Sequence, residues 1–444
     1  KDWKDRPERK PLILRGARQV GKTVSVQMFA QACFKDFIYL NLDDPEHEQL
    51  FRKPMSLEDF AQIIQLKFNK SMRDGETLLF IDEIQNSIPL MKLLRFFYEQ
   101  RPGLHVVAAG SLLEAKIAQK GFSFPVGRVE YAYLYPLDFF EYLAAKGENE
   151  VLAYLRSVTL EKDIPAAIHE MASVLFNEYL IIGGMPEVVR VFLAERNFTA
   201  LHRIYNSLFT SYLDDVYKYA TEAKVKYLTH VLENAPLFAG QNVTYEHFAG
   251  ATFRSREMGE AFDTLEKTML IYRIKGTKDT ALPLIPKRKK AAKIMFLDVG
   301  IVNYRLGIRD KLHQLLGVSG LNEAFRGRIA EQIVGQELLA LGEDSPTQIY
   351  YWYRDVAGST AEVDFILATG DRILPIEVKS GKSGRLRSLK EFVSGSGIKE
   401  TLRIYSGALR KEKVQIDKIG FDLLSVPFYL LPRIKELAKL FGRA

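Results

Sequence analysis

Short apolar runs and longer helical patterns alternate along the first third of the chain. The apolar runs predict strands over residues 12–15, 37–42, 78–81, 104–108 and 129–133. Between them, apolar residues at helical spacing predict helices, among them 56–70 and 89–100. This alternation is typical of a parallel sheet with helices on both faces. We therefore predict an α/β domain over residues 1–140.

The middle of the chain is predominantly helical. From about residue 136 to residue 220 the pattern predicts amphipathic helices and no strand, so we expect a helical, lid-like region over 141–221. Within residues 222–305 the pattern predicts three helices (224–235, 244–250 and 254–268), followed by two extended segments (270–275 and 293–297). Three helices followed by a hairpin is the order of a winged helix.

The C-terminal third, residues 306–444, has a second mixed pattern. A helix is predicted at 327–342, followed by strands at 348–353, 361–367 and 372–379, a helix at 386–394 and a strand at 401–405. The order of this domain is αβββαβ. The predicted fold class of the whole chain is α/β, with the parallel-sheet domain, the helical region and winged helix, and this last domain in sequence.

A glycine-rich motif directly follows the first predicted strand. It reads G-x-x-x-x-G-K-T, the phosphate-binding loop of nucleoside triphosphatases, and a predicted helix follows it. Its backbone N–H groups would converge on phosphates at the helix N-terminus, while Lys22 reaches the terminal phosphates and Thr23 contacts magnesium. The loop consists of Gly16, Ala17, Arg18, Gln19, Val20, Gly21, Lys22 and Thr23. The motif predicts binding of ATP with Mg²⁺.

Two carboxylates follow the third predicted strand, at the edge where parallel sheets bind ligands. We expect Asp82 to hold the magnesium ion and Glu83 to polarise the attacking water. The alternative is that this pair only begins the next helix. After the fourth strand, Ser111 is a candidate sensor that contacts the γ-phosphate or the water.

Composition limits the class of protein. With 47% hydrophobic and 26% charged residues, the chain is globular, and no apolar run is long enough for a membrane span. A single cysteine, Cys33, excludes a disulfide framework, so we expect a cytoplasmic protein. The chain begins at Lys1 without a methionine, which we interpret as a truncated N-terminus and not a signal peptide. The net charge of +7 permits a polyanionic partner without requiring one.

The predicted winged helix carries two basic features. Its third helix contains Arg254, Arg256 and Lys267, and its connector contains the run 287–290 (Lys-Arg-Lys-Lys). In a DNA reader such a helix enters the major groove while the basic wing follows the phosphates. A solvated wing on a protein-interaction module is the open alternative.

The C-terminal domain contains a second group of chemically active residues. Glu377 and Lys379 lie two apart on one predicted strand and so share a face, which Asp364 on the neighbouring strand can also reach. This placement resembles the PD-(D/E)xK nuclease core, and Glu331 matches an acidic helix residue of some members. The three carboxylates would hold Mg²⁺, and Lys379 would stabilise the attacking hydroxide. The opposite, apolar face is expected to hold Val363, Phe365, Ile376 and Val378.

Motifs spread over nearly the whole chain resemble prokaryotic AAA-superfamily ATPases that end in a domain of unknown function related to these nucleases. They are the segments 14–23, 81–85, 110–111, 127–128, 135–137, 183–186, 297–300, 362–365 and 376–380. The resemblance implies an ATP-binding fold with ATP hydrolysis, and it leaves the substrate open. Arg128 lies where AAA-type proteins place an arginine that contacts the γ-phosphate of a bound or a neighbouring nucleotide, and a structural ion pair is the alternative.

Two functions therefore compete. The first is a Mg²⁺-dependent ATPase that acts with DNA through the winged helix and the nuclease-like domain. The second is an ATP-dependent switch or scaffold whose nuclease-like domain binds a partner and cuts nothing. A homo-oligomer is expected only if Arg128 acts on a neighbouring subunit.

Overall fold

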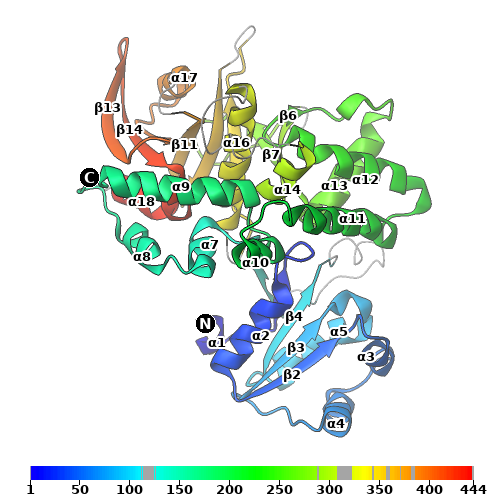
Figure 1. Cartoon of the computed structure of the whole chain (residues 1–444). Helices are drawn as coiled ribbons and strands as arrows, with labels where there is room; N and C mark the ends of the chain where they lie inside the picture. Colours follow the sequence, from blue (N-terminus) through cyan, green and yellow to red (C-terminus); the bar gives the residue numbers. More distant parts are fainter. Residues whose placement is uncertain are drawn as a thin grey trace.

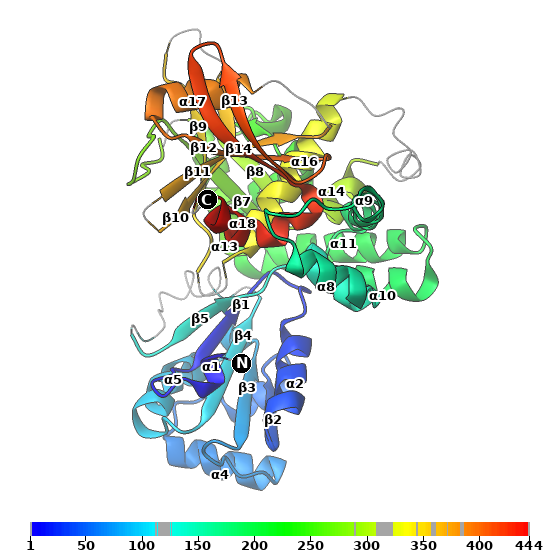
Figure 2. The same ribbon diagram turned by 90° about the vertical axis from the view of Figure 1, so that its left-hand side faces the viewer.

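A computed structural model describes residues 2–442 except 112, 114–124, 126, 288–289, 308–322, 343–344, 357–360, 371 and 382–385. Its strands form two sheets, one in the N-terminal body and one in the remainder of the chain (Figures 1 and 2). Among the described helices, none combines the length and the apolar composition needed to cross a bilayer.

The first sheet has five parallel strands in the order β2-β3-β4-β1-β5. Its strands are β1 (Leu12–Arg15), β2 (Asp36–Asn41), β3 (Thr77–Asp82), β4 (His105–Gly110) and β5 (Glu130–Tyr133). Its helices are α1 (Asp2–Asp5), α2 (Lys22–Cys33), α3 (Pro45–Leu50), α4 (Leu57–Phe68), η1 (Ile84–Asn86) and α5 (Ile88–Gln100). The parallel sheet predicted from the sequence is confirmed.

Strand β3 shows why this sheet needs helices on both faces. Every residue of β3 is buried, and its side chains alternate between two apolar clusters. Leu78 and Phe80 pack with residues of α2, whereas Leu79 and Ile81 pack with residues of α4 and α5. Because successive side chains of a strand point to opposite faces, a continuous apolar run specifies a strand covered on both sides.

A helical region follows the first sheet, with no strand among the described residues between β5 and β6. It contains α7 (Phe139–Lys146), α8 (Asn149–Ser157), α9 (Ala166–Ile182), α10 (Pro186–Glu195) and α11 (Leu201–Tyr219). Helix α7 begins at a capping box, in which Asp138 accepts from the backbone N–H of Glu141 and Glu141 accepts from that of Asp138.

The next segment contains α12 (Glu222–Asn234), η2 (Ala235–Phe238), β6 (Asn242–Val243), η3 (Phe248–Gly250), α13 (Ser255–Lys267), β7 (Ile271–Thr277), β8 (Ala292–Phe296) and α14 (Val299–Arg305). The antiparallel hairpin β7–β8 was predicted. The predicted helix at 244–250 is wrong in extent, since only the single 3₁₀ turn η3 forms there. Backbone angles explain this, because His247 and Ala249 both have positive φ, which an α-helix does not allow.

The second sheet has nine strands in the order β13-β14-β12-β11-β10-β9-β7-β8-β6. Its later strands are β9 (Ile349–Tyr353), β10 (Glu362–Thr369), β11 (Arg372–Lys379), β12 (Glu400–Tyr405), β13 (Arg410–Ile416) and β14 (Ile419–Pro427). The helices around them are α16 (Glu323–Ala340), α17 (Arg387–Ser396), η5 (Phe428–Arg433) and α18 (Ile434–Phe441). The predicted order αβββαβ is confirmed from α16 to β12.

The hairpin β7–β8 is not a free-standing wing. Strand β7 pairs in parallel with β9, so the hairpin lies inside the sheet that continues into the C-terminal strands. One apolar core also runs from the glycine-rich loop, through the helical region, into this sheet. The three boundaries between the four predicted domains remain predictions, but the last two predicted units share one sheet.

The expected apolar face of β10 and β11 needs one correction. Phe365, Ile376 and Val378 belong to the large core, whereas Val363 packs with Ile366 in a separate cluster on the other side. A register shift between Val363 and Ile366 in the pairing of β10 with β9 breaks the two-residue alternation.

Candidate functional site

The glycine-rich loop connects β1 to α2, as its sequence predicted. Gln19 and Gly21 both have positive φ, which curls the backbone at the N-terminus of α2. The ammonium group of Lys22 lies inside this curl and donates to the carbonyl oxygens of Gly16 (2.9 Å) and Ala17 (2.8 Å). Burial lowers the pKa of Lys22 to about 8, although the nearby carboxylates of Glu83 and Asp82 oppose that shift. A phosphate oxygen would replace these carbonyls as the partner of a fully charged lysine.

Thr23 and Asp82 meet at the carboxyl edge of the first sheet. The hydroxyl of Thr23 donates to Oδ2 of Asp82 at 2.6 Å, and Tyr39 approaches the same oxygen at 3.4 Å. Asp82 is 5% exposed, and burial raises its pKa. A hydroxyl and a buried carboxylate in contact offer two hard oxygen ligands on one side of the loop, which suits Mg²⁺.

Glu83 has an unusual backbone conformation at the end of β3. Its φ is 52°, in the left-handed region that non-glycine residues rarely adopt. Its carboxylate accepts from Ser111 Oγ at 3.3 Å and from the side-chain amide of Gln85. The ends of β3 and β4 are therefore joined by Glu83 and Ser111, beside the loop that carries Lys22.

Arg18 does not point along the loop backbone but across to the helical region. Its guanidinium forms an ion pair with Asp215 on α11 at 2.5 Å, and Tyr212 donates to its carbonyl oxygen at 3.3 Å. Asp215 is 2% exposed and also pairs with Lys218. The glycine-rich loop is thus held by α11 through the side chain at its third position.

The segment 183–186, which begins with the glycine pair Gly183 and Gly184, makes a second contact with the glycine-rich loop. Oδ2 of the buried Asp298 accepts from the N–H of Gly184 at 2.7 Å, and Gly184 in turn accepts from the N–H of Leu137 at 2.8 Å. A Cβ atom on Gly184 would lie 2.0 Å from the carbonyl oxygen of Leu137. Two residues further on, Pro186 begins α10 and lies against Gly21.

The predicted C-terminal residues gather around a lysine that the sequence analysis did not single out. Lys293 of β8 is 1% exposed, and its ammonium lies 2.6 Å from Glu331, 3.5 Å from Glu362 and 3.8 Å from Asp364. These carboxylates raise the pKa of Lys293 above its ordinary value, although burial alone would lower it. Lys293 therefore remains charged at the centre of the cluster.

Glu377 and Lys379 complete this cluster. They form an ion pair at 2.5 Å, and the backbone N–H of Val378 between them donates to Oδ2 of Asp364 at 2.7 Å. The second carboxylate oxygen of Glu377 is buried and has no hydrogen-bond partner among the described residues. Burial, with Asp364 nearby, raises the pKa of Glu377 to about 8 and that of Glu331 to about 7.

Three segments of the chain match known protein families. Residues 8–143 match a family model described as an AAA domain, and residues 173–312 and 326–429 match two domains of unknown function, DUF8612 and DUF4143. The chain carries an AAA-type ATPase domain. The comparison with curated proteins gives no match.

The similar solved structures are distant. One is the Holliday junction branch migration motor RuvB of Thermotoga maritima, at 15% identity and a TM-score of 0.26, with 63% of this chain and 85% of that chain covered. Another is a signal transduction ATPase with numerous domains and a tetratricopeptide repeat sensor from Pyrococcus horikoshii, at 12% identity and a TM-score of 0.24. That match covers 76% of this chain and 47% of that chain. Scores this low carry no argument about this chain.

Arg128 lies near the edge of the first sheet that is opposite the glycine-rich loop. Arg128 precedes β5, and the first residue of β5, Glu130, is paired with Leu12 at the start of β1. The glycine-rich loop, in contrast, follows the end of β1. About 10 Å of strand separates the two edges. Arg128 instead forms an ion pair with Glu99 at 2.9 Å. The structure therefore shows the ion pair that was the alternative, and the predicted contact of Arg128 with a γ-phosphate, in its own chain or in a neighbouring subunit, stays a prediction.

The C-terminal cluster does not fit a divalent cation in this arrangement. Among the described residues, no group of three or more acidic, histidine or cysteine side chains is placed to hold a metal ion. Glu331 and one oxygen of Asp364 turn toward Lys293, and the other oxygen of Asp364 accepts from the backbone. The predicted metal role of Glu331, Asp364 and Glu377 is therefore not supported, because an ammonium group already supplies the positive charge.

Sequence reasoning missed three residues that hold these sites together. Lys293 could have been noticed as a single lysine within the apolar strand 292–296, where a charge requires a partner. Asp298 lies in the motif 297–300, which the sequence alone gives no chemical role. Asp215 gave no signal, because an acidic residue on a helix is ordinary and its partner is 197 residues away.

Proposed function

We propose that this chain is a Mg²⁺-dependent ATPase in which nucleotide state is passed from the AAA domain to the helical region and the second sheet. The contact of Thr23 with Asp82 beside the buried Lys22 supports this proposal most directly. A chance glycine-rich turn would not require a hydroxyl, a carboxylate and a lysine to converge at one sheet edge.

In the proposed reaction, the chain's own residues position the nucleotide and the water. The backbone N–H groups of the loop and Lys22 bind the phosphates, and Thr23 and Asp82 hold Mg²⁺. The metal, when bound, neutralises charge that develops on the phosphate oxygens. Glu83 orients the attacking water, and Ser111 keeps the Glu83 carboxylate at the site by hydrogen bonding.

The proposal is tested by separating binding from turnover. Glu83→Gln keeps the shape of the side chain but removes its negative charge, so ATP binding should persist while the hydrolysis rate falls by at least about a hundredfold. Glu58→Gln, at an exposed position in the first turn of α4, is the matched control and should hydrolyse ATP normally. Equal turnover by Glu83→Gln and the wild type would reject the assigned role.

For the C-terminal domain we favour a partner-binding module that cuts nothing, over a nuclease. Lys293 within the acidic cluster supports this choice, since the charge that a catalytic metal would supply is already present. A relation of this domain to PD-(D/E)xK nucleases remains part of the proposal. Metal-dependent cleavage of DNA that disappears in Asp364→Ala would overturn the choice and restore the nuclease.

DNA remains a candidate partner through the connector of the β7–β8 hairpin. Of its four basic residues, Arg288 and Lys289 lie outside the described residues, Lys287 is exposed, and the ammonium of Lys290 lies 4.2 Å from the ring centroid of Tyr353. Neutralising all four should weaken DNA binding and lower its salt slope by about one for each phosphate that is no longer bound. Unchanged affinity and slope would favour the solvated wing on a protein-interaction module.

A further inference from the structure

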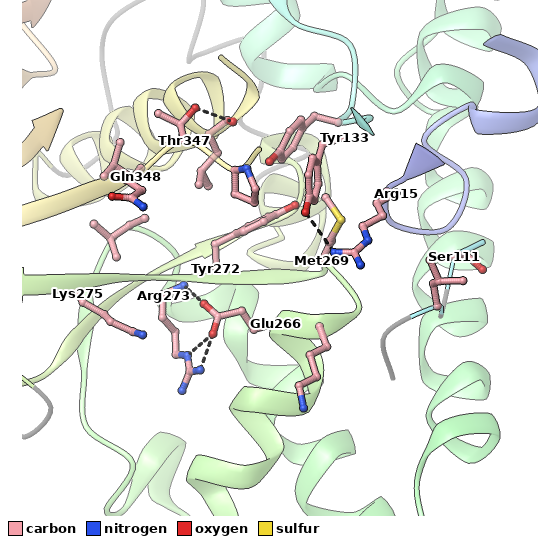
Figure 3. A pocket seen from close by; sticks show the side chains of 18 of the residues that line it. Arg15, Ser111, Tyr133, Glu266, Met269, Tyr272, Arg273, Lys275, Thr347 and Gln348 are labelled. Atoms are coloured by element: carbon pink, nitrogen blue, oxygen red, sulfur yellow. Dashed lines mark hydrogen bonds and ion pairs between the residues drawn. The ribbon is translucent and has the colours of Figure 1, made fainter. Parts of the chain in front are cut away.

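A cavity of about 330 Å³ lies between the AAA domain and the second sheet. Its wall on one side comes from the ends of β1 and β4 and the segment after β5, and on the other side from α13, β7 and the segment that leads into β9 (Figure 3). Its volume is at the lower end of the range for small-molecule sites. The cavity is therefore large enough for one small ligand that would touch both parts of the chain.

Aromatic side chains from both parts line this cavity. Tyr133 and Tyr135 come from the AAA side, and Tyr272 and Tyr350 come from β7 and β9. The rings of Tyr135 and Tyr272 lie next to each other across the boundary, tilted by 38° with their centroids 6.2 Å apart. Tyrosine rings in such a wall offer flat surfaces against which a planar aromatic ligand can stack.

Two hydroxyl groups in this wall have no hydrogen-bond partner among the described residues. They belong to Tyr135, which is 9% exposed, and to Tyr272. Burial raises the pKa of both residues, so both hydroxyls stay neutral and can donate. A buried polar group without a partner is costly, and a ligand that accepts from both would remove this cost.

The cavity also has an excess of positive charge. The described residues that line it include one carboxylate, Glu266, which is held by Arg273 through two guanidinium nitrogens. Lys267 and Lys275 are exposed at the rim, and the described residues give neither of them a carboxylate partner within ion-pair distance. Arg15, which donates to the hydroxyl of Tyr133 at 3.2 Å, adds a third positive charge. An anionic group on the ligand is therefore favoured at this rim.

This cavity is distinct from the predicted ATP site but touches it. Lys22, Thr23 and Asp82 do not line it, whereas Gly16 and Ser111 do. Ser111 also donates to Glu83, the proposed water-orienting residue. A ligand in the cavity would therefore contact Ser111, the residue that holds the Glu83 carboxylate.

We propose that the cavity binds one nucleotide, with its base stacked on the tyrosines and its phosphate at the Arg15, Lys267 and Lys275 rim. The nucleotide is either free or one unit of a single-stranded nucleic acid, since both present the same base and phosphate. The proposal does not depend on cleavage by the C-terminal domain or on ATP hydrolysis.

The test uses the full chain saturated with Mg-ADP, so that the glycine-rich loop is filled. AMP and a short 5′-phosphorylated oligothymidylate are titrated separately by calorimetry. Tyr272→Ala should weaken binding about tenfold or more, as expected for loss of one stacked base. Lys275→Gln should weaken it in a salt-dependent way. The matched control is Tyr217→Ala, which removes a tyrosine that is 70% exposed on α11 and should change nothing.

Each outcome of this titration either supports or overturns the proposed nucleotide site. Binding of AMP alone supports a free nucleotide, and binding of the oligonucleotide, with or without AMP, supports a strand, provided that Tyr272→Ala weakens it. Tyr272→Phe keeps the ring but loses the hydroxyl that donates to the ligand, so it should also weaken binding, and it replaces Tyr272→Ala if that variant does not fold. Binding of neither probe, or binding left unchanged by Tyr272→Ala or, where that variant does not fold, by Tyr272→Phe, would overturn the proposal.

Discussion

Replacing Lys293 with methionine should destabilise the C-terminal part of the chain severely. The methionine keeps most of the side-chain volume but removes an ammonium group that lies within 3.8 Å of three carboxylates and is 1% exposed. Removing one partner of a buried ion pair leaves an uncompensated charge and costs about 3–5 kcal/mol. Lys413→Met, at an exposed position of β13 in the same sheet, should change stability by no more than about 0.5 kcal/mol.

The loss of stability caused by Lys293→Met can be measured by urea unfolding, followed through the fluorescence of one tryptophan. The chain has two tryptophans, and Trp352 lies buried in β9 beside the cluster. In a Trp3→Phe background it therefore reports unfolding of the second sheet.

Folding raises the pKa of Glu331 to about 7, so the charged carboxylate is disfavoured in the folded chain. The stability of the fold therefore falls as the pH rises from the pKa of Glu331 in the unfolded chain through that value. Loss of Lys293 strengthens this effect.

The destabilisation by Lys293→Met should thus be larger at pH 8 than at pH 5. Adding Glu331→Gln and Asp364→Asn should recover part of the lost stability, because the uncompensated charges disappear while the size of each side chain is retained. A change below about 1 kcal/mol for Lys293→Met, or a change that does not depend on pH, would show that the lysine is not the charge at the centre of this cluster.

Three further predictions concern the glycine-rich loop and the segments that hold it against the helical region. Burial raises the pKa of Asp298 to about 6, so its folded form holds a proton more tightly and wild-type stability should fall between about pH 4 and pH 6. In Asp298→Asn this slope should be absent from thermal unfolding curves. Gly184→Ala should cost about 1–3 kcal/mol because its Cβ meets the carbonyl of Leu137, whereas Gly395→Ala in α17, with open space around it, should be neutral or slightly stabilising. Since the pKa of Lys22 is about 8, ATP binding at pH 9 should take up a proton, measurable by calorimetry in buffers of different ionisation enthalpy.

Local patterns were sufficient to predict most of the elements. The buried runs of the first sheet and the αβββαβ order depend on periodicity and turns within short segments, and both are confirmed. The glycine-rich loop could also be located, because its function requires residues that are adjacent in sequence. The pairing of β7 with β9 could not be predicted, since it joins strands separated by more than 70 residues through backbone groups that any sequence provides.

The candidate sites divide in the same way. Thr23 and Asp82 could be paired in advance because parallel strands deliver their ends to one edge. The partners of Arg18 and of the acidic cluster could not, because Asp215 and Lys293 come from distant elements whose placement depends on tertiary packing. The positive φ at His247 and Ala249 that shortened the predicted 244–250 helix likewise has no clear sequence signature.

Equilibrium titration of Mg-ATP tests the central claim most directly. The wild-type chain should bind one ATP with saturation, and Lys22→Ala should abolish detectable binding, because the ammonium group is the only side-chain cation that the described structure places within the curl of the loop. Lys35→Ala, on the exposed end of the connection after α2, is the control and should bind as the wild type does. Saturable binding of ATP by Lys22→Ala with wild-type affinity would contradict the account.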